Sequence, residues 1–192
     1  MRSVKIVLGL GNPGREFVST RHNFGARSLA IACERRDLVL VPSLRSRSFL
    51  AEHRDGLDTI AFAFPQTYMN NSGEALQGLM KRYKLASPSD LIVLHDELDL
   101  APGVVRIKSG GGVAGHNGLR SIVAQLGSSS FSRVRIGIGR PMGSQSVVDY
   151  VLTRLSTKDL DSFERSLLDA ADALDLILAK GVEVAMNEFN GN

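Results

Sequence analysis

The side chains best suited to chemistry are one histidine, one aspartate and three asparagines, each near a predicted strand end or helix start. They are His22, Asp96, Asn12, Asn70 and Asn117. A neutral imidazole paired with a carboxylate takes a proton from water, and carboxamides hold a carbonyl group or donate to an oxygen on which charge develops. These residues therefore predict metal-independent hydrolysis.

No side chain stands in surroundings typical of a catalytic nucleophile. Ser72 precedes a glycine, but the G-x-S-x-G pattern is absent. Cys33, the single cysteine, lies beside Ile31 and Ala32 in a predicted helix, which favours a buried apolar position over a reactive thiol. We therefore expect water to be the attacking group.

A metal site is a weaker interpretation. Four candidate ligands lie close together, His95, Asp96, Glu97 and Asp99. Alternate side chains at a strand end point to opposite faces of the sheet, and neither an H-x-x-x-H nor a C-x-x-C pair is present. We expect no metal.

Nicotinamide binding is a second weaker interpretation. The sequence Gly9-Leu10-Gly11-Asn12-Pro13-Gly14 fits G-x-G-x-x-G after a strand. That fingerprint requires a helix that opens through the third glycine, whereas helical apolar spacing resumes only at Phe24. The acid expected after a second strand is also missing, because Glu34 falls in a helix pattern and Asp37 precedes its strand. We expect no cofactor.

The elements that must position these residues alternate between strands and helices. Strands are predicted at residues 4–10, 38–41, 49–53, 59–64, 91–94, 104–108 and 134–138. Helices are predicted at residues 24–36, from a capping-box-like Asn71-Ser72-Gly73-Glu74 to Tyr83, at 117–126, from Ser156/Thr157 to Gly181, and near 182–189. Short loops between them predict an α/β fold with largely parallel buried strands. Loops after parallel strands converge on one crevice, so we expect the loops of His22 and Asn12, Asn70, Asp96 and Asn117 to face one cleft.

Composition and charge restrict the function further. The chain has 192 residues, 43% hydrophobic and 22% charged, and no linker divides it, so we expect one domain. No run approaches the roughly 20 apolar residues of a membrane helix, no signal-peptide pattern is present, and one cysteine favours the cytoplasm.

The charge is distributed unevenly along the chain. Residues 1–140 carry 19 Lys/Arg and 11 Asp/Glu, net +8, whereas residues 141–192 carry 4 Lys/Arg and 9 Asp/Glu, net −5. This asymmetry suggests a polyanionic partner, with a merely lopsided surface as the alternative.

Together, the motifs resemble those of bacterial-type peptidyl-tRNA hydrolase over nearly the whole chain. They are Gly9-Leu10-Gly11-Asn12-Pro13-Gly14, Thr20-Arg21-His22-Asn23, Met69-Asn70-x-Ser72-Gly73, His95-Asp96-Glu97-Leu98-Asp99-Leu100, Gly110-Gly111-Gly112-x-x-Gly115-His116-Asn117-Gly118, Arg135-Ile136-Gly137-Ile138-Gly139-Arg140-Pro141 and Met186-Asn187. Their order and spacing are highly specific in combination.

The resemblance implies one catalytic domain over residues 1–192, with a twisted mixed sheet flanked by helices and C-terminal helices at about 157–189 packed on it. It implies an enzyme that cuts the ester between a peptide and the 3′-terminal ribose of tRNA, and we expect that enzyme to be a monomer. His22 would be the general base, Asp96 its partner, and Asn12 would help distinguish N-blocked from free aminoacyl-tRNA. Substrate-binding positions implied by it are Phe17, Tyr68, Asn70, His116 and Asn117, and those for tRNA phosphates are Arg106, Lys108 and Arg135.

The sequence departs from the family pattern at three places, one of them a pair of residues. Phe17 replaces a usual tyrosine, which removes a hydroxyl but keeps a ring for stacking. Val113-Ala114 replaces a more glycine-rich pair, and Glu188 stands where a basic residue is common. A catalytically idle RNA-binding relative is the alternative function, and the presence of both His22 and Asp96 argues against it. We further expect backbone N–H groups of the loop at residues 110–112 and of the helix opening at Asn117 to help bind phosphate.

Overall fold

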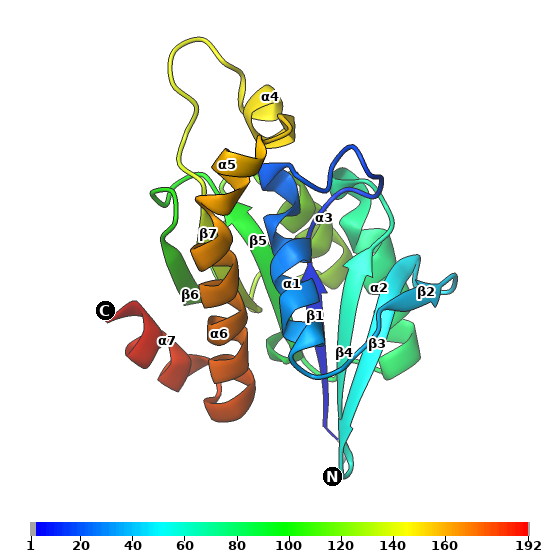
Figure 1. Cartoon of the computed structure of the whole chain (residues 1–192). Coiled ribbons are helices and arrows are strands. Elements are labelled where there is room, and N and C mark those ends of the chain that lie inside the picture. Colours follow the sequence, from blue (N-terminus) through cyan, green and yellow to red (C-terminus); the bar gives the residue numbers. More distant parts are fainter. Residues whose placement is uncertain (1–2, 192) are drawn as a thin grey trace.

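A computed structural model describes residues 3–191, and its strands form one mixed sheet in the order β2-β3-β4-β1-β5-β7-β6 (Figure 1). The strands are β1 Val4–Gly9, β2 Val41–Ser43, β3 Ser48–Asp55, β4 Asp58–Pro65, β5 Leu91–Glu97, β6 Val105–Ser109 and β7 Ser132–Gly137. The four central strands, β4, β1, β5 and β7, pair in parallel, and β2, β3 and β6 are antiparallel to their neighbours. The α/β prediction with a largely parallel centre is therefore confirmed.

Helices cover both faces of the sheet, with α1 and α6 in front of it and α2 and α3 behind it in Figure 1. The helices are α1 Phe24–Glu34, α2 Ser72–Tyr83, α3 Asn117–Leu126, α4 Val147–Leu152, α5 Thr157–Asp161, α6 Glu164–Lys180 and α7 Val182–Asn190. Apolar side chains of the sheet divide into two clusters: Val7, Phe62 and Leu94 belong to the cluster that includes α1 and α6 residues. Leu8 and Val93 belong to the cluster that includes α2 and α3 residues. Every residue of β5 is buried, as expected for a central parallel strand.

Some predicted boundaries are wrong for local reasons. The strand predicted at residues 38–41 begins only at Val41, because the Leu38 amide bonds the Cys33 carbonyl at the end of α1. The helix predicted from Ser156 divides into α5 and α6, and the break places the Phe163 ring against Phe24 with 4.9 Å between centroids.

Two helix starts also differ from the sequence prediction. Asn71 makes no capping hydrogen bond with its side chain, and Glu74 pairs with Arg47 instead of completing a capping box. Helix α4, which the sequence pattern did not predict, begins after Ser146, whose side chain accepts from the Asp149 amide. Within residues 3–191, none of the helices has the length and apolar character needed to cross a membrane.

Candidate active site

A cavity of about 410 Å³ lies where the central parallel strands end, and we call it the cleft. Eight of the site residues predicted from the sequence line it: Asn12, Phe17, His22, Tyr68, Asn70, Asp96, His116 and Asn117. The three predicted phosphate-binding residues, Arg106, Lys108 and Arg135, are not part of its lining. The predicted residues therefore fall into two separate groups.

Parallel pairing explains how most of the polar residues reach the cleft. Asn12 follows β1, Asn70 lies in the short 3-10 helix η2 (Met69–Asn71) after β4, and Asp96 lies near the end of β5. Asn117 reaches the cleft by another route than the sequence predicts, because the strand before it is not parallel to its neighbour. Strand β6 is antiparallel to β7, and its end at Ser109 pairs with Ser132, the first residue of β7. The loop after β6 must therefore carry the chain back to the cleft before α3 begins.

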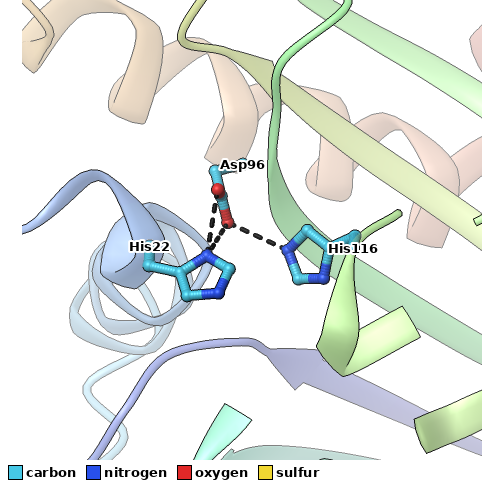
Figure 2. A group of neighbouring side chains, drawn as sticks. All are labelled: His22, Asp96 and His116. Atoms are coloured by element: carbon cyan, nitrogen blue, oxygen red, sulfur yellow. Dashed lines mark hydrogen bonds and ion pairs between the residues drawn. The ribbon is translucent and has the colours of Figure 1, made fainter. Parts of the chain in front are cut away.

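The centre of the cleft is a carboxylate shared by two histidines (Figure 2). His22 Nδ1 lies 3.0 Å from each carboxylate oxygen of Asp96, and His116 Nε2 lies 3.0 Å from Oδ1. Nδ1 of His116 accepts from the amides of Gly118 and Leu119, at 3.1 and 3.3 Å, and so caps α3. The His116 proton must therefore be on Nε2, which donates to Asp96.

These contacts set the ionisation of the pair. Asp96 is 3% exposed. Burial alone would raise the pKa of Asp96, but attraction to His22 and His116 and hydrogen bonds from both outweigh it and lower that pKa. Burial lowers the pKa of His22, and the charge and hydrogen bond of Asp96 raise it by more. The carboxylate stays ionised and holds the His22 proton on Nδ1, which leaves Nε2 of the neutral ring free to accept a proton.

A metal ion does not fit this arrangement. Ligand atoms of His22, Asp96 and His116 lie within 4.8 Å of one another. A metal on His116 Nε2 would displace its proton to Nδ1, where the two α3 amide hydrogens already point. The hydrogen bonds favour proton chemistry at these three residues.

Asn12 is held so that only its amide nitrogen is available to a ligand. Its Oδ1 accepts from the Met69 amide at 2.7 Å. Asn23, which sequence reasoning listed only within a motif, donates to the Asn12 carbonyl and accepts from the Asn12 amide, both at 2.9 Å. Nδ2 of Asn12 has no acceptor in the described part of the chain, so this side chain offers a donor to the cleft.

The remaining walls are aromatic and aliphatic. Phe17 and Tyr68 make an edge contact with ring centroids 6.4 Å apart, and Tyr68 is 60% exposed. Tyr68 is exposed and Phe17 is half-buried, and aromatic rings at a cleft wall can stack on a nucleobase. The aliphatic wall comes from α4, through Val147, Val148, Val151 and Leu152. Sequence reasoning missed it, although Ser146 and Asp149 form a capping pattern ahead of an apolar run.

Outside the cleft, four cations form what we call the basic ladder: Arg106, Lys108, Arg133 and Arg135. In the antiparallel register Arg106 lies opposite Arg135 and Lys108 opposite Arg133, so all four side chains project from one face. Arg135 Nε pairs with Glu97 Oε2 at 3.0 Å.

Arg133 differs from the rest of the ladder because it is buried, 2% exposed. Its guanidinium donates to the carbonyls of Gly111 and Gly112, both at 2.6 Å. The expectation that amides at the start of α3 bind phosphate is wrong for Gly118 and Leu119, because His116 already accepts from both.

Comparison with known proteins gives a consistent result. The sequence model of a family described as peptidyl-tRNA hydrolase matches residues 6–192. A peptidyl-tRNA hydrolase of Chloroflexus aurantiacus is 43% identical over 185 residues, covering 96% of this chain and 98% of that protein. One from Moorella thermoacetica is 41% identical over 191 residues, covering 99% and 100%. The crystal structure of peptidyl-tRNA hydrolase from Acinetobacter baumannii matches with a TM-score of 0.88 at 33% identity, covering 99% of this chain and 96% of that one.

Proposed function

The chain belongs to the peptidyl-tRNA hydrolase family and hydrolyses peptidyl-tRNA, and we propose that His22 is the general base of this reaction. The observation that carries the proposal is the contact of His22 Nδ1 with both oxygens of Asp96. That contact holds the proton on Nδ1, so Nε2 takes a proton from water as the water oxygen attacks the ester carbonyl carbon. Asp96 stabilises the imidazolium that forms.

The collapse of the tetrahedral intermediate returns that proton. The bond between the carbonyl carbon and the ribose oxygen breaks, and the imidazolium gives its proton to the leaving ribose oxygen. Asn70 and Asn117 line the cleft and are our choice of donors to the oxygen on which negative charge develops. Phe17 and Tyr68 supply rings for the 3′-terminal nucleotide.

We assign Asn12 to the selection of N-blocked substrates. Its free Nδ2 donates, and an N-acyl group offers a carbonyl oxygen that accepts. A free α-amino group is a solvated cation without an acceptor, so it gains nothing from this donor and loses its water. We assign Arg106, Lys108 and Arg135 to tRNA phosphates, because they share one face and a polyanion relieves their mutual repulsion.

We also propose that the chain works as a single catalytic domain and as a monomer in the cytoplasm. The site residues lie on strands of one sheet or on segments connected to them, and α6 and α7 pack on α1 and β6, respectively. Side chains of one chain are enough to line the cleft. The single cysteine, Cys33, cannot form an internal disulfide, which favours a reducing compartment such as the cytoplasm.

The test is release of peptide from N-acetylaminoacyl-tRNA, with unblocked aminoacyl-tRNA as the control substrate. General-base assistance contributes about 10²–10⁴-fold, so His22→Ala should lose at least about that much in kcat and still bind tRNA. His53→Ala is the matched histidine variant, because His53 lies on β3 outside the cleft lining, and it should keep its rate. Near-normal turnover by His22→Ala would show that the base is another group.

A further inference from the structure

Arg21 belongs to the same motif as His22, but the chemistry above gives it no role. Its guanidinium carbon lies 4.1 Å from the centroid of the Tyr150 ring, and its Nη1 donates to the Tyr150 carbonyl at 3.3 Å. Tyr150 lies in α4, and Arg21 begins the short helix η1 (Arg21–Asn23) that carries His22. Arg21 therefore connects the segment of the general base to the aliphatic wall of the cleft.

Tyr150 also ties α4 to the sheet. Its hydroxyl donates to the Ile138 carbonyl, 2.5 Å away and next to the end of β7. Between these two points the chain makes the long loop that stands out above α4 in Figure 1. Just beyond α4, the Leu155 amide donates to the Ser19 carbonyl at 2.9 Å. Helix α4 is thus held at Tyr150 and again just after its end. The partners, Arg21 and Ser19, lie one and three residues before His22 in the sequence.

The face that α4 presents to the cleft is apolar and exposed. Val147 is 41% exposed and Val148 is 59% exposed, and both line the cleft with Val151 and Leu152. The polar groups that the ester needs come from the asparagines and from His22, on other walls of the cleft. An aliphatic surface beside an ester site suits the carbon atoms of an amino-acid side chain or peptide.

We propose that Arg21 and Tyr150 are positioning residues that hold α4 beside His22, so that its aliphatic wall binds the aminoacyl end of the peptide during hydrolysis. The proposal rests on the cleft as the place of reaction. The Arg21–Tyr150 contact fixes the wall, and Val148 provides part of its surface. We call the Arg21–Tyr150 pair the latch. The latch acts through substrate binding, since neither residue is assigned to the reacting atoms.

The experiment combines hydrogen exchange with kinetics on Arg21→Met and Tyr150→Leu. Loss of one cation–π contact should speed amide exchange in residues 147–155 about two- to fivefold. KM for N-acetylaminoacyl-tRNA should rise by a similar factor, with kcat and the salt dependence of KM little changed. Val148→Ser keeps the latch, so it should raise KM while exchange stays at the wild-type rate.

A second arginine–tyrosine pair provides the matched control. The Arg82 guanidinium carbon lies 5.3 Å from the Tyr83 ring centroid, and neither residue lines the cleft. Arg82→Met and Tyr83→Leu should leave KM and the exchange of residues 147–155 unchanged.

Three results would overturn the proposal. Faster exchange with unchanged KM would mean that the wall does not bind substrate, and unchanged exchange would mean that the pair does not hold α4. A weaker salt dependence in Arg21→Met alone would assign Arg21 to a phosphate. Normal turnover by His22→Ala would instead overturn the proposed base, whatever these variants do.

Discussion

The cleft and the basic ladder handle charge in opposite ways. In the cleft, the buried Asp96 carboxylate accepts hydrogen bonds from His22 and His116, so its charge is compensated before any substrate arrives. In the ladder, cations face cations: Arg106 lies opposite Arg135, and Lys108 lies opposite Arg133. Like charges directly opposite in a sheet destabilise it.

The difference agrees with the step that we propose for each region. A reacting centre must be ordered in advance, because reorganising charges during the reaction costs rate. A phosphate-binding face gains affinity from charges that remain uncompensated until the polyanion replaces its counterions. We therefore expect variants in the cleft to change kcat and its pH dependence, and variants in the ladder to change KM and its salt dependence.

After His22→Ala, the largest effect should come from Asp96→Asn. An amide has one acceptor oxygen, whereas the two histidines place two donors on the carboxylate. The His22 ring keeps its place but loses the charge and part of the orientation that Asp96 supplies. We expect kcat to fall by more than about tenfold but by less than in His22→Ala, whose loss is about 10²–10⁴-fold.

The same variant should shift the pH profile. If His22 is the general base, as we propose, the rate rises with pH as His22 loses its proton. Asp96 holds the pKa of His22 above its ordinary value. Without the charge of Asp96, burial lowers that pKa. The acid limb of kcat/KM should therefore move to lower pH in Asp96→Asn, even though the plateau is lower. An acid limb that stays in place would show that a group other than His22 controls it.

His116 allows the two functions of one side chain to be separated. Asn is a good helix N-cap, so His116→Asn keeps a cap for α3 but is too short to reach Asp96 as His116 does. We expect kcat to fall about tenfold, the value of one hydrogen bond to a charged group, with little change in unfolding free energy. His116→Ala should lose a further 0.5–2 kcal/mol or so of stability. Equal stability of the two variants, measured by urea unfolding, would contradict the capping role.

A smaller effect is expected on selectivity in Asn12→Asp. One carboxylate oxygen would still accept from the Met69 amide, and the other would replace the Nδ2 donor. An ammonium group is attracted to this charge, whereas a carbonyl oxygen is repelled. The ratio of kcat/KM for blocked and unblocked substrates should therefore narrow by about tenfold or less. A ratio that stays the same would remove Asn12 from substrate selection.

The comparison also explains what the sequence could predict. Apolar runs and turn residues were enough to predict the parallel strands β1, β4 and β5, and with them the meeting of Asn12, Asn70 and Asp96. These inferences depend on local pattern and on one topological rule. The approximate starts of α3 and α7 followed from local pattern as well.

What escaped prediction depends on contacts between distant segments. The tautomer of His116 is decided by amides of α3 and by Asp96, 20 residues away. The donor that Asn12 presents depends on Met69, 57 residues along the chain. The break before α6 accompanies the packing of the Phe163 ring against the Phe24 ring. No periodicity or spacing in the sequence contains this information.

In the ladder, sequence and structure together separate two kinds of arginine. Arg106 and Lys108 have no carboxylate within salt-bridge distance among residues 3–191, and Arg135 retains one, Glu97. Arg133 is buried against Gly111 and Gly112. A single count of positive charges would treat all four alike, although only three are accessible to a phosphate.

The smallest individual effects are therefore expected in Arg106→Ala, Lys108→Ala and Arg135→Ala. Each should raise KM for full tRNA about two- to fivefold, as expected for an exposed ion pair, and each should flatten the log K against log salt slope by about 0.7–0.9. The contacts are the same in ground and transition states, so kcat should hold. For a short substrate with only the 3′-terminal nucleotides, KM should be nearly unchanged in all three variants.

Arg133→Met is the matched control. It should lose about 1–3 kcal/mol of stability, because the Gly111 and Gly112 carbonyls lose their donors, while the salt slope stays unchanged. If the short substrate suffered as much as full tRNA, the three accessible ladder residues would act on the cleft, and the separation of chemistry from phosphate binding would fail.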